Sequence, residues 1–175
     1  MLHSYKGVFP NIKSNVYLAE GVQIIGDVTI QDDASIWYNT VLRGDLAPIY
    51  IGNKTNIQDG SVGHVNMNQP LWIEDEVSVG HGVIVHGCRI AKGCLIGMGA
   101  ILLNGAEIGE YALIGAGSIV TENQKIPPYT LSFGSPAKVV RELTEQDLLR
   151  MKTTMENYVV KGMEYRRELG INEIQ

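Results

Sequence analysis

The sequence predicts an all-β solenoid, a parallel β-helix of hexapeptide repeats, followed by a C-terminal α-helix. Three observations support this fold. An aliphatic residue recurs every six positions, a small or β-branched residue follows most of these four places later, and charged residues become much denser after residue 140. A period of six cannot keep one face of an α-helix, which repeats about every 3.6 residues, whereas a short strand and a turn, repeated, satisfy it.

The aliphatic positions of the repeat extend over most of the first 114 residues. They are Ile12, Leu18, Ile24, Ile30, Ile36, Leu42, Ile51, Ile57, Ile73, Val79, Val85, Ile90, Ile96, Leu102, Ile108 and Ile114. Three hexads would close a triangular coil of about 18 residues, and successive coils would stack as parallel strands about 4.8 Å apart. We expect these side chains to point inward. Glycines would form many of the tight corners, since 18 of the 20 precede residue 141.

Three interruptions break the six-residue period. Steps of nine, ten and five residues separate Leu42 from Ile51, Gly63 from Ile73, and Val85 from Ile90. The first predicts a bulge of about three residues near 47–49, and the second predicts a loop of about four residues within 65–71. The third is a one-residue deletion. Loops escape the packing constraint and often carry function, so we expect a site near these interruptions.

The charge density divides the chain into two parts. Residues 1–140 carry 20 charged side chains, whereas the 35 residues 141–175 carry 13. We therefore predict a β-helix domain over 1–140 and a C-terminal helix within 141–175 that packs on the β-helix or on a neighbouring chain. Thr144 is the expected N-cap, because acidic residues follow it in the first turn. The expected apolar stripe is Leu148, Met151, Met155, Tyr158, Val159, Met163 and Tyr165.

Composition argues against several functions. The net charge is −5 with both signs mixed, which is unlike a nucleic-acid-binding protein. The sequence contains no apolar run long enough to span a membrane and no apolar signal-peptide core near Met1. Cys88 and Cys94 are too few for a disulfide framework, and we expect Cys94 to pack in the core. These observations predict a cytoplasmic protein with neither nucleic acid nor membrane as a partner.

Three histidines point to a metal site. His64, His81 and His86 lie within 23 residues, and three imidazoles plus a water form a recurrent catalytic zinc shell. His64 and His86 are each the second residue of a hexad and are one coil apart, so they are expected to be neighbours about 4.8 Å apart. His81 lies one side away around the triangle. A second copy could supply it, and a three-fold assembly would then have three equivalent sites. The alternative is three ordinary turn or surface histidines, and one chain supplying all three ligands would contradict a shared site.

The same register extends both columns by one coil. Arg43 is predicted to stack under His64, and Asp59 is predicted to stack under His81. If the two faces meet at an interface, Arg43 and Asp59 meet there too, and the planar guanidinium matches a carboxylate. Asp45 is close enough in sequence to share Arg43. The alternative is a solvated ion pair.

These residues resemble the motifs of the γ-class carbonic anhydrases and their bacterial relatives. The matching segments are V-L-R-G-D at 41–45, I-G-N-K-T-N-I-Q-D at 51–59, V-G-H at 79–81, V-H-G-C at 85–88 and L-I-G-M-G-A at 95–100. The resemblance implies a left-handed β-helix homotrimer with a metal at each subunit interface. His64 and His86 of one chain and His81 of the next would be the ligands.

The resemblance also implies an activity, the reversible hydration of carbon dioxide by metal-bound hydroxide. Gln58 would hydrogen-bond the metal-bound water or hydroxide, and Arg43, Asp45 and Asp59 would form the network around the site. The expected metal is Zn²⁺, with Fe²⁺ or Co²⁺ as alternatives. The substrate would be a small molecule. Tyr158 is expected to have a packing role on the C-terminal helix, and the alternative is that the helix approaches the site there.

The chain departs from the family pattern in its acidic residues. Active members carry glutamates after the R-G-D motif and in the loop after the first histidine. Here Leu46 follows Asp45, and residues 65–70 contain no acid. Either another group or the buffer carries the proton, or hydration is slow or absent. Two other functions stay open: a hexapeptide-repeat acyl- or acetyltransferase using coenzyme A, whose catalytic histidine usually sits on a long loop, and a non-catalytic metal-binding trimer.

Overall fold

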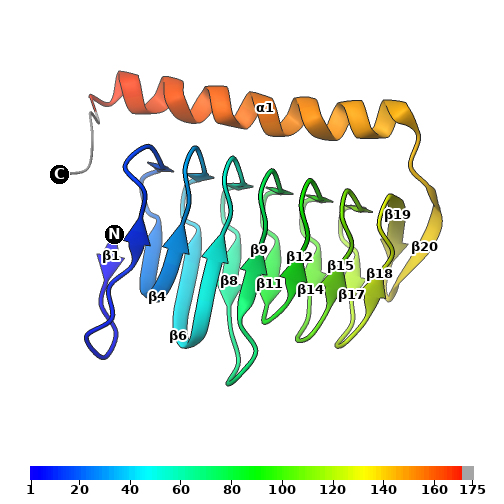
Figure 1. Ribbon diagram of the computed structural model, residues 1–175, viewed down its shortest axis with the longest axis horizontal. Helices are drawn as coiled ribbons and strands as arrows, with labels where there is room; N and C mark the ends of the chain where they lie inside the picture. The colour runs from blue at the N-terminus through cyan, green and yellow to red at the C-terminus, as the bar shows by residue number, and fades with distance from the viewer. Residues whose placement is uncertain (171–175) are drawn as a thin grey trace.

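The computed structural model describes residues 1–170 and confirms the predicted solenoid. The chain forms a left-handed parallel β-helix whose coils stack along the long axis of the molecule, with one helix laid lengthwise beside them (Figure 1). The strands form a 12-stranded and an 8-stranded sheet. The long strands β4 (Gln23–Ile30) and β6 (Val41–Ile51) each pass a corner, so the larger sheet lines two sides of the triangle.

Most of the remaining strands have two or three residues and recur once per side of each coil, and the last two, which are longer, end the solenoid. The larger sheet also contains β1 (Leu2–His3), β2 (Asn11–Ile12), β8 (Val62–His64), β9 (Leu71–Ile73), β11 (Ile84–His86), β12 (Arg89–Ile90), β14 (Ile101–Leu102), β15 (Glu107–Ile108), β17 (Ile119–Val120) and β18 (Lys125–Ile126). The smaller sheet contains β3 (Tyr17–Leu18), β5 (Ser35–Ile36), β7 (Asn56–Ile57), β10 (Ser78–Val79), β13 (Leu95–Ile96), β16 (Leu113–Ile114), β19 (Thr130–Gly134) and β20 (Ala137–Glu142).

The predicted aliphatic positions form the core. From Ile24 onward all of them are buried, and only Ile12 and Leu18 in the first coil are half-buried. The hydroxyl groups of small polar residues at the inward corners form hydrogen bonds with the next coil. The Thr40 hydroxyl donates to the carbonyl of Gln58, and the Ser61 hydroxyl donates to the carbonyl of Gly80. Burying a hydroxyl is tolerated because it has this partner.

The first interruption has the predicted size but a different place. Gly26 pairs with Gly44 and Val28 pairs with Ile49, so residues 45–48 stand opposite a single residue of β4. The extra residues number three, as predicted, but placing Ile49 in the bulge was wrong. Ile49 is 1% exposed and pairs with Leu71 on its other side, because its side chain fills an inward position. The second interruption closes as a tight loop in which Asn66 and Gln69 exchange backbone hydrogen bonds.

A β-hairpin and a capped helix end the described chain. Strand β19 pairs in parallel with β16 and antiparallel with β20, so it joins the last coil to the exit of the solenoid. Helix α1 (Glu145–Glu168) begins after the predicted N-cap Thr144, whose side chain and backbone exchange hydrogen bonds with Asp147. Predicted helical residues 171–175 lie outside the described part of the chain.

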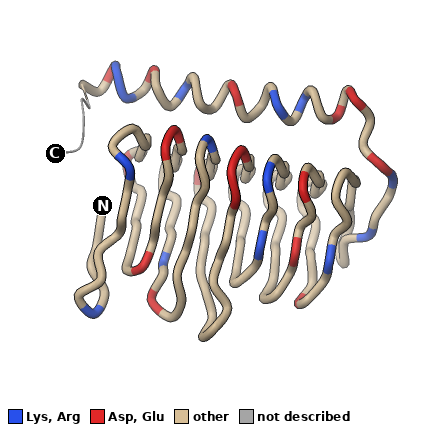
Figure 2. The backbone as a smooth tube through the Cα atoms, viewed as in Figure 1, with Lys and Arg blue, Asp and Glu red and all other residues tan. Residues whose placement is uncertain are grey.

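Helix α1 packs lengthwise against the smaller sheet, where it contacts β3, β5, β7 and β10 (Figure 1). Its buried residues are Met151, Met155 and Gly162. The expected stripe was wrong at Met163, which is 47% exposed. Gly162 occupies the inner face instead, and its missing side chain lets the helix approach Ser35 and Tyr17. No helix within residues 1–170 has the apolar length needed to cross a membrane. Figure 2 shows both charge signs interspersed along α1.

Both cysteines are buried, as predicted for Cys94, and both are free. Burial raises the pKa of each thiol to about 12, so the reactive thiolate does not form near neutral pH. We expect the native protein to stay unlabelled by a disulfide reagent at about pH 8, and both thiols to react once it is unfolded in denaturant. Rapid labelling of one cysteine in the native protein would contradict this burial.

Candidate metal centre

Two histidines stack on one face of the β-helix. His64 ends β8 and His86 ends β11, their Cα atoms are register partners, and Arg43 is the partner of His64 on the coil before. The predicted column of Arg43, His64 and His86 is therefore confirmed. His64 Nδ1 lies 3.0 Å from His86 Nε2, and the ring centroids are 5.0 Å apart.

Asp45 orients His64. Its Oδ1 accepts from His64 Nε2 at 2.9 Å, and its Oδ2 pairs with the Arg43 guanidinium. Burial raises the pKa of Asp45, but the hydrogen bond from His64 and the contact with Arg43 outweigh it, so the pKa lies below its usual value. Asp45 is therefore an ionised acceptor at neutral pH. With Nε2–H donated to Asp45, Nδ1 is the nitrogen of His64 that can bind an ion.

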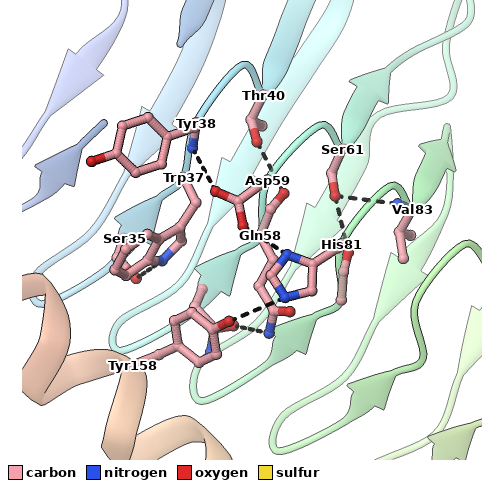
Figure 3. A network of polar contacts seen from close by, with 12 residues as sticks. Ser35, Trp37, Tyr38, Thr40, Gln58, Asp59, Ser61, His81, Val83 and Tyr158 are labelled. Atoms are coloured by element: carbon pink, nitrogen blue, oxygen red, sulfur yellow. Dashed lines mark hydrogen bonds and ion pairs between the residues drawn. The ribbon is translucent and has the colours of Figure 1, made fainter. Parts of the chain in front are cut away.

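The third histidine lies on another side of the coil. His81 follows β10, and Asp59 occupies the equivalent position after β7, since Val79 pairs with Ile57. Asp59 Oδ2 lies 2.7 Å from His81 Nδ1, so the predicted column of Asp59 and His81 is also present (Figure 3). The backbone N–H of Tyr38 donates to Asp59 as well. His81 is half-exposed, and Nε2 is the ring nitrogen that Asp59 does not engage.

Tyr158 of α1 reaches this second group. Its hydroxyl lies 3.5 Å from His81 Nε2, and its ring packs edge-on against Trp37 with centroids 5.2 Å apart (Figure 3). Burial and the charge of Asp59 raise the pKa of Tyr158, so the phenol is neutral near pH 7. The expected packing role is present, and the hydroxyl also contacts His81, so both roles that the sequence allowed for Tyr158 are found together.

Gln58 is held rigidly beside His81. The side chain is buried, and its Nε2 donates to Asn56 Oδ1 at 3.0 Å. The amide of Asn56 donates in turn to Ser78 Oγ at 2.8 Å. This chain of hydrogen bonds ties the Gln58 amide to the coil that carries His81, since Ser78 begins β10.

The chain therefore carries two separate groups of candidate site residues. We call Arg43, Asp45, His64 and His86 the first half-site, and Gln58, Asp59 and His81 the second half-site. Within residues 1–170, no group of three or more His, Cys, Asp or Glu is arranged to hold a metal ion. A three-histidine shell consequently requires a second copy of the chain, and that assembly stays a prediction.

One polar contact of the first half-site was not predicted from the sequence. Asn104 Oδ1 lies 2.7 Å from His86 Nδ1. Counting by register leads from His86 to Leu103, since Val85 pairs with Leu102, and Asn104 reaches back from the next position. A search one residue either side of each column would have found it.

A hydrophobic ladder flanks the first half-site. Two positions before the histidines, five stacked aliphatic residues face outward, and two of them are about 40% exposed. They are Val41, Val62, Ile84, Ile101 and Ile119. An exposed aliphatic row of this kind is typical of a surface that contacts another protein.

Comparison with known proteins agrees with the motifs. The model of the bacterial transferase hexapeptide (six repeats) family matches residues 87–122. A carbonic anhydrase of Geobacillus kaustophilus is 54% identical over 95% of this chain and 91% of its own. Gamma carbonic anhydrase 2, mitochondrial, of Arabidopsis thaliana is 38% identical over 86% of this chain and 56% of its own. A Bacillus cereus crystal structure with a provisional acetyltransferase name superposes with a TM-score of 0.95 at 51% identity, over 95% of this chain and 97% of that one. Given these identities and the two half-sites, the chain belongs to the γ-class carbonic anhydrase-like family of hexapeptide-repeat proteins.

Proposed function

We propose that this protein is a metal-dependent carbonic anhydrase-like enzyme that hydrates carbon dioxide reversibly at the interfaces of a homotrimer. His64 and His86 of one chain and His81 of the next would bind the ion. The observation that carries the proposal is the stacked pair of imidazoles, each with one nitrogen fixed by an acceptor, together with a third, similarly fixed imidazole on a different side of the coil.

The first half-site has dimensions that suit a tetrahedral ion. Two nitrogens bound at about 2.0 Å to such an ion lie about 3.3 Å apart, and His64 Nδ1 and His86 Nε2 are 3.0 Å apart. Imidazole ligands favour Zn²⁺, and Fe²⁺ and Co²⁺ are the alternatives. Held by the three histidines, such an ion would lower the pKa of a bound water toward about 7 and would so supply the nucleophile for carbon dioxide hydration.

The residues of the chain orient the ligands. Asp45 holds the ring of His64 and Asp59 holds the ring of His81, in each case by accepting from the nitrogen that does not face the ion. Arg43 balances the charge of Asp45. Gln58, fixed by Asn56, offers an amide that can hydrogen-bond the reacting water. Beside these residues, the hydrophobic ladder would be covered by the neighbouring subunit.

The acetyltransferase alternative has less support. Such enzymes need a histidine that can reach the acyl acceptor, usually on a long protruding loop. The loop at 66–70 is short, and the three site histidines lie in the β-helix wall or its turns. We propose a cytoplasmic location from the sequence alone.

The experiment that tests the proposal combines metal analysis with stopped-flow hydration. We expect about one metal per chain and three per trimer, and hydration that disappears when a chelator removes the ion and returns with Zn²⁺, Fe²⁺ or Co²⁺. An acetyl-coenzyme A hydrolysis and transfer assay, run in parallel, should show no turnover. Metal-loaded protein without hydration activity would overturn the enzymatic proposal in favour of a non-catalytic metal-binding trimer.

The proton acceptor gives a second readout in the same assay. Leu46 and residues 65–70 supply no acid, and we propose that the proton released by hydration passes to an external base. We expect the rate to rise with buffer concentration at constant ionic strength and pH. A rate independent of buffer would contradict this expectation and would require a proton-carrying group within the chain.

A further inference from the structure

His86 is oriented by a side chain from the next coil. Asn104 follows β14, is half-buried, and places Oδ1 2.7 Å from His86 Nδ1. Its Nδ2 donates to Glu122 Oε1, one further coil along, at 3.4 Å. The first half-site is therefore part of a polar ladder that crosses successive coils from Asp45 to Glu122.

The contact determines which nitrogen of His86 is available. An amide oxygen can only accept, so His86 Nδ1 carries a proton, and Nε2 is the nitrogen left to share an ion with His64 Nδ1, 3.0 Å away. Glu122 determines the orientation of the amide in the same way. A carboxylate accepts from the NH₂ end of Asn104 and leaves the oxygen end toward His86.

The backbone makes room for this contact at Gly87. The residue has a φ of +52°, and a Cβ there would lie 2.7 Å from Asn104 Oδ1 and 3.2 Å from the carbonyl oxygen of Gln69. Any side chain at this position would push the amide away from His86. The close approach of Asn104 therefore explains why a glycine, Gly87, follows His86.

We propose that Asn104 is a positioning residue for the metal site, with Glu122 as its support. The inference rests on the proposed function, because it assumes that His86 binds an ion. Each of the three histidines then has an oxygen acceptor behind it: Asp45 for His64, Asp59 for His81 and Asn104 for His86. Asn104 is the one neutral acceptor among them, so it orients the ring without adding a third negative charge.

The test uses two readouts on Asn104→Leu, which keeps the approximate volume but removes the acceptor. The first readout is histidine ¹⁵N NMR of the metal-free protein, which distinguishes Nδ1–H from Nε2–H. The wild type should show Nδ1–H at His86, and the variant should lose this preference. The second is metal affinity by competition with a chelator, for which we expect a loss of about 10–100-fold.

Two further variants separate orientation from folding. Asn104→Asp combined with Glu122→Gln keeps an acceptor toward His86 and should retain affinity within about threefold. Glu122→Ala, at an exposed position, should shift both readouts in the direction of Asn104→Leu by a smaller amount, and it is not expected to disturb folding. Glu107→Gln is the matched control, since Glu107 is exposed and pairs with Lys125 on another side of the coil.

The outcomes distinguish this inference from the proposed function. A wild type that binds no metal overturns both. A wild type that binds metal, with unchanged His86 tautomer and affinity within about twofold in Asn104→Leu and Glu122→Ala, overturns the role of Asn104 alone. Lost tautomer preference and lost affinity that Asn104→Asp with Glu122→Gln restores support it.

Discussion

Two variants that are each inactive, His81→Asn and His64→Ala, are expected to recover metal binding and hydration when they are co-expressed. Each variant alone lacks one ligand at every interface. Losing a residue that only supports a ligand lowers metal affinity by up to about 100-fold, so we expect the loss of a ligand itself to lower it by more than about 100-fold. In a mixed trimer, one interface joins the intact first half-site of the His81→Asn chain to the intact His81 of the other chain. That interface has all three imidazoles.

The size of the recovery follows from the symmetry. With equal amounts of both chains, roughly three quarters of the trimers are mixed and each contains one restored site, so roughly one quarter of all sites recover. Two different affinity tags isolate the mixed trimers, and metal content and hydration rate are then measured on them. The control is co-expression of His64→Ala with His86→Ala, which share a damaged half-site and should show no recovery. Purified mixed trimers that stay metal-free would contradict a site shared between subunits.

Both half-sites could be predicted because a parallel stack has a fixed rise and register. Counting by coils placed Arg43 beneath His64 and Asp59 beneath His81, and the strand pairing reproduces both columns. The same counting could not place the bulge at 45–48. The period gives the number of extra residues, but the packing of Ile49 beside Leu71 decides which of them leave the wall.

The contacts that the sequence did not reveal depend on the reach of side chains. Asn104 stands one position beyond the register partner of His86 and extends back to it through a space left by Gly87. Tyr158 belongs to the predicted apolar stripe of α1, but the stripe does not say which coil of the β-helix each of its residues meets. Neither the reach of the amide nor the position of the helix along the coils is encoded in the six-residue period.

Truncating Ile57 should produce the largest loss of stability among single substitutions near the site. The side chain is fully buried and stacks between Ile36 and Val79 of the neighbouring coils. We expect Ile57→Ala to lower the free energy of unfolding by about 2–5 kcal/mol, because it removes buried methyl groups and leaves a cavity. Ile57→Val, the matched control, should cost about 0.5–1.5 kcal/mol.

The measurement is denaturant unfolding of the metal-free protein at one fixed protein concentration, because both bound metal and subunit association add apparent stability. The effect should extend to the site, since Gln58 and Asp59 follow Ile57 directly and His81 stands on the next coil. Each coil of a solenoid contacts only its neighbours, so a cavity at Ile57 weakens the coupling between the coils that carry Asp59 and His81. We therefore expect Ile57→Ala to weaken metal affinity as well as stability, whereas Ile57→Val should leave metal affinity nearly unchanged. Equal stability losses for the two variants would mean that the side chain does not fill the space between coils, and the second half-site would then need another source of rigidity.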